Sequence, residues 1–349
     1  MFWYATASLT PAVLLALACL YGGPVALLAV LSITVLVFFM DKLGRHLPQP
    51  QSDGRVLCLL LALVHFPLLA LGVWALSTQA GHSLTDKLLI FTGLGLYVGQ
   101  VSNSNAHELI HASARLPRRL GAAVYVSLLH GHHVSAHLKV HHIHAATDKD
   151  PNSARAGESF WAYALRATGG EFSAGLRAET ALRKGPTPKG GRSIHPYVFY
   201  ILGGTAAPIA ALLLAGIKGL LIYLAIALYA QMQLLLSDYV QHYGLRRHLQ
   251  PNGKPEPMGP EHSWNAPKWY SSAMMLNAPR HSDHHIRPAR PFTNLEITPQ
   301  TMPLLPQSLP VMAVIALVPP LWHRVMDKRA ARWQKTAQPT GSPTAFLQD

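Results

Sequence analysis

Residues 86–111 read DKLLIFTGLGLYVGQVSNSNAHELIH, an apolar run that ends in two histidines four residues apart. A helix needs about 20 predominantly apolar residues to cross the hydrocarbon core of a membrane, and this run is long enough. Residues four apart lie on one face of a helix, so His107 and His111 can bind one ion together. The stretch therefore predicts a membrane helix that carries metal ligands at one end.

The composition of the whole chain indicates a membrane protein. Hydrophobic residues make up 50% of the 349 residues and charged residues 13%, whereas soluble proteins carry about 25% charged residues. The two cysteines, Cys19 and Cys58, lie inside apolar runs, which excludes a disulfide framework, a CxxC zinc site and a fused rubredoxin-like iron site. Nucleic-acid binding is disfavoured, because the basic residues do not gather on one soluble domain with interleaved aromatics.

Other apolar runs of similar length surround the first one. We expect an all-α integral membrane protein with about six transmembrane helices, in a single domain over residues 1–335. Gly22-Gly23-Pro24 divides the first long apolar run in two, and the Ser/Thr/Pro/Gln-rich tail 336–349 is predicted to be disordered. The predicted spans are 5–21, 24–40, 56–76, 86–111, 197–216 and 220–243.

The distribution of basic residues predicts the orientation in the membrane. Six spans place both termini on one side, and 27 of the 29 lysines and arginines fall on that same side. Only Lys87 and Lys218 lie near the opposite face. Because positive charge marks cytoplasmic loops, we expect an inner-membrane protein with both termini and the histidine-rich segments in the cytoplasm.

Nine of the twenty histidines fall in four short segments of the sequence, which we call knots: 107–111, 137–142, 242 and 281–285. His137 and His141 repeat the four-residue spacing of the first knot, so they are expected to share a face and chelate together. His242 ends the last span at the same membrane depth. One metal accepts about four to six ligands, so nine imidazoles suggest two metals, and all-nitrogen ligation fits iron or copper better than magnesium or calcium. The nine candidates are His107, His111, His137, His141, His142, His242, His281, His284 and His285.

The histidines also allow other interpretations. The first knot matches the His-Glu-x-x-His pattern of zinc proteases, in which Glu108 would be the general base. A protease needs one further ligand, whereas this chain offers seven more in clusters. His242 taken alone is equally well an interfacial residue. His130, His132, His133 and His144 are close enough to the second knot to support its ligands, and His46, His65, His82, His195, His248 and His323 are isolated surface or packing residues.

These motifs resemble those of the membrane-bound alkane monooxygenases, within the fatty acid desaturase and hydroxylase superfamily. The resemblance covers most of the chain from about residue 105 to residue 327. It rests on His-Glu-Leu-Ile-His at 107–111, Ala-His-Leu-Lys-Val-His-His at 136–142 with Ala-Thr-Asp-Lys-Asp-Pro at 146–151, Asp-Tyr-Val-Gln-His-Tyr-Gly-Leu at 238–245, and Ala-Pro-Arg-His-Ser-Asp-His-His at 278–285.

Four positions depart from the motifs of that family. Ala136 and Gln241 stand where the family has Glu, Val140 where it has Gly, and Asp238 where it has Asn. The nine histidines are intact, so the departures fall on their neighbours, which orient ligands and tune a metal. They leave the substrate open.

The resemblance implies a diiron centre that activates O2 and hydroxylates a terminal methyl group of an alkane, giving a primary alcohol. No catalytic residue beyond the metal centre is implied. Electrons would come from a separate rubredoxin or ferredoxin with its NAD(P)H-dependent reductase. Glu108, His132, Asp238 and Asp283 are candidates to support the ligands.

Four alternatives remain open at this stage. A hydroxylase of another apolar methyl group, such as a xylene side chain, is the nearest of them. A desaturase or hydroxylase of lipid acyl chains comes next. The metalloprotease, which needs only one ligand beyond the first knot, and a non-enzymatic metal- or haem-binding membrane protein are more remote.

Overall fold

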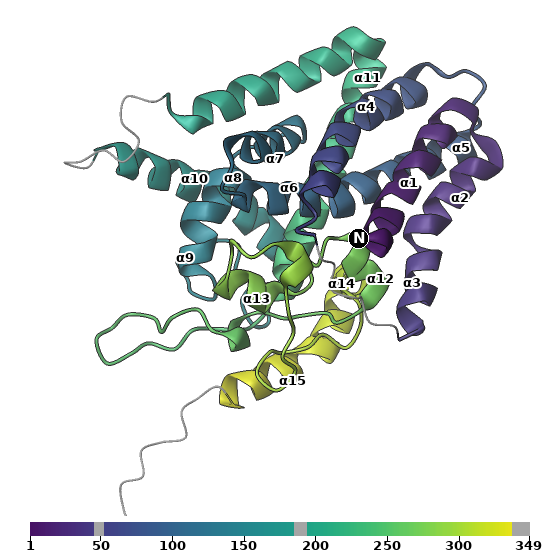
Figure 1. Cartoon of the computed structure of the whole chain (residues 1–349). Coiled ribbons are helices and arrows are strands. Elements are labelled where there is room, and N and C mark those ends of the chain that lie inside the picture. The colour runs from purple at the N-terminus through teal and green to yellow at the C-terminus, as the bar shows by residue number, and fades with distance from the viewer. Residues whose placement is uncertain (45–51, 185–193, 337–349) are drawn as a thin grey trace, which may run out of the picture.

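Helices are the main regular elements of the described chain (Figure 1). This computed structural model describes residues 1–44, 52–184 and 194–336, and within them the only β structure is two isolated bridges. The predicted all-α fold class is therefore confirmed. The predicted tail falls, apart from its first residue, outside the described residues.

Four helical segments are long and apolar enough to cross a membrane. Large apolar side chains on them face outward; Val13, Leu28 and Phe39 are 57%, 53% and 62% exposed. Such extended apolar surface marks contact with lipid or another apolar partner, and the protein is a membrane protein. The segments are α1 (Phe2–Tyr21), α2 with α3 (Gly23–Ile33 and Val35–Lys42), α4 (Arg55–Thr78) and α11 (Pro196–His242).

The predicted span 86–111 is one nearly continuous helical run. It consists of α5 (Leu84–Tyr97), the π-helical turn η1 (Val98–Ser102) and α6 (Asn103–His111). Ser83 begins the run with a capping box, because its side chain accepts the backbone N–H of Asp86 and the Asp86 carboxylate accepts that of Ser83. Single π-turns inside helices often lie at functional sites, and this one leads directly into the first histidine pair.

The two predicted spans at 197–216 and 220–243 both lie in α11. The helix is broken at Ala215 and Gly216, and Gly216 has φ 64°, a conformation that glycine adopts without steric cost. Figure 1 shows the two parts of α11 running in different directions. The break lies at the predicted boundary, and the number of membrane crossings remains a prediction.

The remaining helices carry or surround the histidine knots. Several of them are single turns, so they are fixed by contacts with the long helices. They are α7 (Arg115–Ser127), α8 (His133–Ala136), the π-helix η2 (His137–His141), α9 (His142–His144), α10 (Phe160–Lys184), η3 (Pro260–His262), α12 (Trp269–Met274), α13 (His281–Ile286), η4 (Phe292–Asn294), α14 (Leu309–Ala316) and α15 (Pro319–Thr336).

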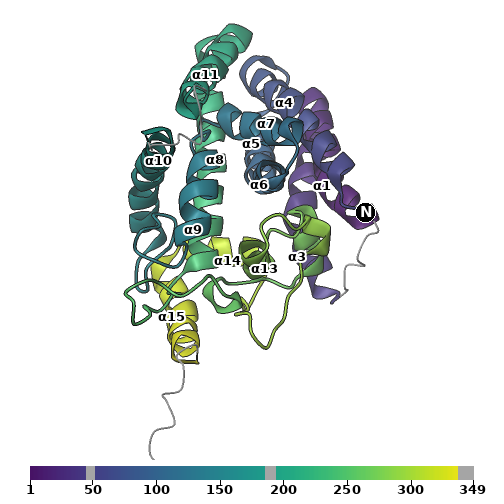
Figure 2. The same cartoon turned by 60° about the vertical axis from the view of Figure 1, so that its left-hand side comes forward.

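Two buried polar side chains hold the segment with the last histidine knot. The Asp41 carboxylate, at the end of α3, accepts the backbone N–H groups of Tyr270 and Ser271 at 2.9 and 3.0 Å, which fastens α12. The Asn265 side chain accepts the backbone N–H of Ser282 at 2.9 Å, which fastens α13. As a result α13 lies in the middle of the molecule, below α6 in the view of Figure 2.

Candidate metal centre

All nine predicted ligand histidines lie together in two adjacent clusters. Within each cluster the candidate ligand atoms are all within 4.8 Å of one another. The rings come from α6, η2 with α9, the end of α11, and α13, which are far apart in the sequence. The first cluster is His107, His111, His137, His142 and His284; the second is His141, His242, His281 and His285.

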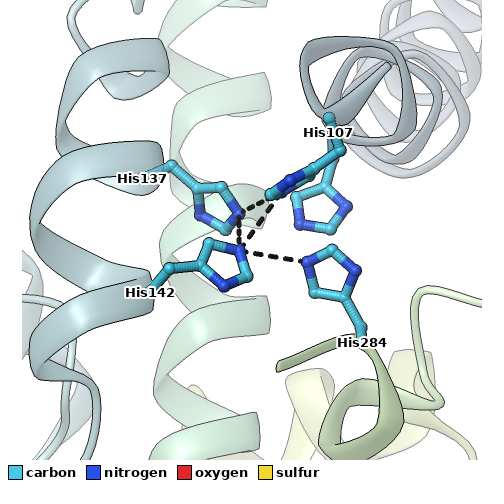
Figure 3. A group of neighbouring side chains, drawn as sticks. His107, His137, His142 and His284 are labelled. Carbon is cyan, nitrogen blue, oxygen red and sulfur yellow. Dashed lines mark hydrogen bonds between the residues drawn. The ribbon is translucent and has the colours of Figure 1, made fainter. Parts of the chain in front are cut away.

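His142 lies at the centre of contacts in the five-histidine cluster (Figure 3). Its Nε2 is 3.2 Å from that of His111, 2.9 Å from that of His137 and 3.2 Å from that of His284. The Nε2 atoms of His111 and His137 are 3.1 Å apart. His107 points into the same space, and its Nε2 has no hydrogen-bond partner among the described residues.

The four-histidine cluster has the same arrangement with every ring buried. The Nε2 atoms of His242, His281 and His285 form a triangle with sides of 2.9, 3.0 and 3.2 Å. The ring of His141 completes the cluster, with its centroid 4.7 Å from that of His242 and 4.9 Å from that of His285.

Hydrogen bonds among the rings cannot account for these contacts. Each Nε2 is either a donor or an acceptor, so in a triangle of three such atoms at least one pair has two donors or two acceptors. An ion at the centre lets every Nε2 present a lone pair. All-imidazole ligation suits iron, copper or zinc, so the residues fit the metal that the motifs imply.

Comparisons with known proteins agree with this geometry. The fatty acid desaturase family model matches residues 87–315. The chain belongs to the fatty acid desaturase family. It is 33% identical to alkane 1-monooxygenase 1 of Alcanivorax borkumensis over 291 residues, covering 82% of this chain and 70% of that protein.

The similarity extends to a second alkane 1-monooxygenase and to a xylene/toluene monooxygenase component. The alkane 1-monooxygenase of Acinetobacter baylyi is 30% identical over 317 residues, covering 88% of this chain and 76% of that protein. The xylene/toluene monooxygenase hydroxylase component of Pseudomonas putida is 28% identical over 248 residues, covering 67% of this chain and 62% of that protein. Within this family, the two histidine clusters fit a non-haem iron site.

The predicted chelation of one ion by His137 and His141 is wrong. His137 belongs to the five-histidine cluster and His141 to the four-histidine cluster. The cause is η2, because residues 137–141 form a π-helix, whose repeat is i to i+5 rather than i to i+4. His137 therefore shares a face with His142, and the wider turn directs neighbouring histidines to different clusters.

Asp150 is a supporting residue that sequence reasoning missed. Its carboxylate accepts a hydrogen bond from Nδ1 of His141 at 2.9 Å, which leaves Nε2 of His141 free to face the cluster. Burial raises the pKa of Asp150, but His141, the hydrogen bond from Ser153 and the nearby His242 together hold the pKa below its ordinary value. Carboxylates that hold ligand histidines in this way orient the ring and strengthen the ligand. The signal was available, since Asp150 is the second aspartate of the quoted 146–151 motif.

The four side chains predicted to support the ligands have other principal contacts. Glu108 accepts the backbone N–H of Phe292 at 3.2 Å, and the ring of His132 lies against Phe172. Asp283 pairs with Arg290 at 2.9 Å, so it stabilises the loop after α13. Asp238 accepts the side-chain N–H of Asn152 at 2.8 Å and lines a cavity that reaches the clusters.

That cavity is apolar along most of its wall and ends at the histidines. Its wall comes from α5, η1, α11 and α14, with Leu96, Met232 and Leu309 among the lining residues. His107 and His137 of the first cluster and His281 of the second also line it. Both clusters therefore face one apolar cavity.

Proposed function

We propose that this protein is a membrane-bound non-haem diiron monooxygenase that hydroxylates the terminal methyl group of n-alkanes to primary alcohols. The observation that carries the proposal is the apolar cavity that ends at histidines of both clusters. The relatives named alkane 1-monooxygenase support the substrate class. One iron ion would be held by each cluster, and O2 would be the co-substrate.

The chain's own residues perform three tasks in this reaction. The nine imidazoles would hold two irons, which when bound would supply O2 activation and the oxidation of a strong C–H bond. Asp150 fixes the tautomer of His141, so that its Nε2 keeps a lone pair for the ion. The buried rings of the four-histidine cluster and the apolar wall of the cavity keep bulk water away from the reacting end of the substrate.

An alkane has no polar group, so burial and shape must supply its binding energy. Each buried CH2 group contributes about 0.8 kcal/mol, and the side chains that line the cavity offer an apolar environment. A second apolar cavity shares Leu96, Gln100, Pro310 and Val314 with the first and reaches Phe38 and Phe39 on α3. Because Phe39 is 62% exposed on a membrane helix, this route lets an alkane enter from the bilayer.

Hydroxylation of another apolar methyl group is the second candidate. Amide side chains interrupt the apolar wall, since Gln100 and Gln233 line the cavity and hydrogen-bond to each other at 3.2 Å. The similarity to the xylene/toluene monooxygenase component also favours this candidate. Oxidation of lipid acyl chains would use the same centre and the same membrane route.

We further propose that the protein lies in the inner membrane, with both termini and the metal centre on the cytoplasmic side. The excess of lysine and arginine on that side supports the orientation. Electrons would come from a separate rubredoxin or ferredoxin and its NAD(P)H-dependent reductase. A basic surface assists encounter with an acidic donor, and the positive-inside pattern alone accounts for its presence.

One reconstitution experiment tests the function. The full chain in lipid nanodiscs is loaded with iron and supplied with rubredoxin, its reductase, NADH and a mixture of n-alkanes and xylenes. We expect two irons per chain and primary alcohols from the alkanes. Two irons with xylene products only would move the assignment to the second candidate, and one zinc with no iron would reject the oxygenase.

A further inference from the structure

A third group of metal-ligand side chains lies beside the nine histidines and is distinct from them. His130, His133 and Glu171 are 2%, 1% and 1% exposed, and their candidate ligand atoms lie within 4.8 Å of one another. Glu171 projects from the middle of α10, His133 begins α8, and His130 lies in the turn before it. The rings of His133 and His137 have centroids 5.1 Å apart, so this group adjoins the five-histidine cluster.

Glu171 is a buried carboxylate that lacks a lysine or arginine partner in the described residues. Its Oε1 lies 2.6 Å from Nδ1 of His133, and its Oε2 lies 3.4 Å from Nε2 of His130. The Asn152 side chain donates a further hydrogen bond at 3.3 Å. A buried carboxylate without a positive partner is strongly destabilising, so the two rings and the carboxylate together favour a positive charge between them.

Two sources of that charge are available, namely a proton on one of the two rings or a cation. A protonated imidazole carries two N–H donors, but Nε2 of His133 has no hydrogen-bond partner among the described residues. Leaving a charged donor unsatisfied in a buried site costs more than leaving a neutral one. A divalent cation outweighs the single charge of Glu171 and keeps both imidazoles uncharged, and Asp238, which shares the Asn152 side chain with Glu171, supplies a second carboxylate.

We propose that His130, His133 and Glu171 bind a third divalent metal ion, with the chemistry of a zinc site made of two imidazoles and one carboxylate. Zinc binds imidazole nitrogen and carboxylate oxygen at about 2.0–2.2 Å in tetrahedral geometry, so its ligand atoms lie about 3.4 Å apart. The contact between His130 and Glu171 already has that length. The contact between His133 and Glu171 must open by less than about 1 Å, as the proton between them leaves to solvent.

The third ion would fix one wall of the substrate cavity. It joins α10 to the α8 segment, and His133 lines the cavity together with Asp238. The Asn152 side chain contacts both carboxylates, at 3.3 Å for Glu171 and 2.8 Å for Asp238, so the ion's carboxylate ligand is itself held in place. The site is separate from the proposed diiron centre, and it stands or falls independently of the alkane reaction.

Metal analysis of three purified variants tests the site. The full chain is loaded with iron, then incubated with zinc, desalted, and assayed for both metals by mass spectrometry. We expect one tightly bound zinc per wild-type chain in addition to iron. Glu171→Gln should lose the zinc and keep the iron, whereas His284→Ala should lose iron and keep the zinc.

Glu179→Gln is the matched control on the same helix. The Glu179 carboxylate is also buried, but Ser135, Lys139 and Arg183 already bind it, so this variant should keep the zinc. The iron content of Glu171→Gln shows whether that variant folds. Wild-type protein with no zinc beyond the iron sites would overturn the proposal and leave a protonated histidine–glutamate cluster. Zinc that is lost in His284→Ala but kept in Glu171→Gln would place it in the nine-histidine centre and also overturn the proposal.

Discussion

The two histidine clusters use the same side chain but have different surroundings. All four rings of the second cluster are buried, whereas His107, His111 and His142 of the first are only half-buried. Asp150 hydrogen-bonds to a ring of the second cluster, and the described residues place no carboxylate in that role for the first. The first cluster also supplies two of the three ligand histidines that line the cavity.

This difference indicates that the two clusters would hold their proposed ions unequally. The four-histidine cluster is enclosed and has a carboxylate behind one ligand, which favours tight binding. The five-histidine cluster has one more ligand but is open to the cavity and to solvent. The comparison therefore predicts a firmly held ion at the second cluster and a more exchangeable one at the first.

Removing one ligand from each cluster gives the largest expected effect. His284→Ala and His285→Ala should each abolish hydroxylation, because oxidation requires both irons in the proposed reaction. Each should lose mainly the iron of its own cluster, so that iron content falls from two per chain toward one. Product analysis and metal analysis of the same preparations check this.

His323→Ala is the control for this pair. His323 contacts Tyr243 at 3.0 Å and Asp327 at 3.3 Å, away from both clusters, so activity and iron content should be kept. Equal activity in His284→Ala and His323→Ala would refute the assignment of the ligands.

The sequence predicted which histidines come together but not how they divide between clusters. The four knots and their position at the ends of predicted helices were sufficient to predict that nine rings come together, because helix periodicity is a local property of the chain. The division depends on η2, and no pattern in residues 137–141 distinguishes a π-turn from an α-turn. A shift of one residue in helical repeat moved His141 to the other cluster.

Supporting residues were harder to predict because they depend on tertiary contacts. Asp150 lies nine residues from His141 and Glu171 lies 38 residues from His133. Neither spacing carries a helical or turn signature, and Asp150 could have been found only through the 146–151 motif. The α11 break at Gly216 could be predicted more closely, because a change in hydropathy and nearby glycines mark it in the sequence.

Replacing Asp150 tests the carboxylate support of the second cluster. Asp150→Asn should weaken iron binding at the four-histidine cluster by about 10- to 100-fold, as is typical for loss of such a partner. The five-histidine cluster should keep its affinity. Iron titration followed by Mössbauer spectroscopy can resolve the two sites, and Asp148→Asn, an exposed neighbour, should leave both unchanged. Equal weakening of both sites would remove the distinction between the clusters.

Chelation of the loaded protein tests the difference in exposure. A soluble chelator should remove iron in two phases. The five-histidine site should lose its iron several times faster than the four-histidine site, because local access governs such exchange. His285→Ala, which retains the first cluster, should show only the fast phase. A single phase in wild-type protein would mean that burial of the rings does not control release.

Replacing Glu108 should change the hydroxylation rate least, in contrast to replacing Asp150. It lies between the first two ligands in sequence, yet its carboxylate accepts a hydrogen bond from Phe292 rather than from a ligand ring. Glu108→Gln keeps an acceptor for that N–H, so hydroxylation should stay within about two-fold of wild type, since less than one hydrogen bond is lost. A zinc protease that used the His-Glu-x-x-His pattern would lose its general base and all activity. The measurement is the initial rate of hydroxylation with a saturating n-alkane. A large loss of this rate in Glu108→Gln would show that the first cluster depends on Glu108, as the second depends on Asp150.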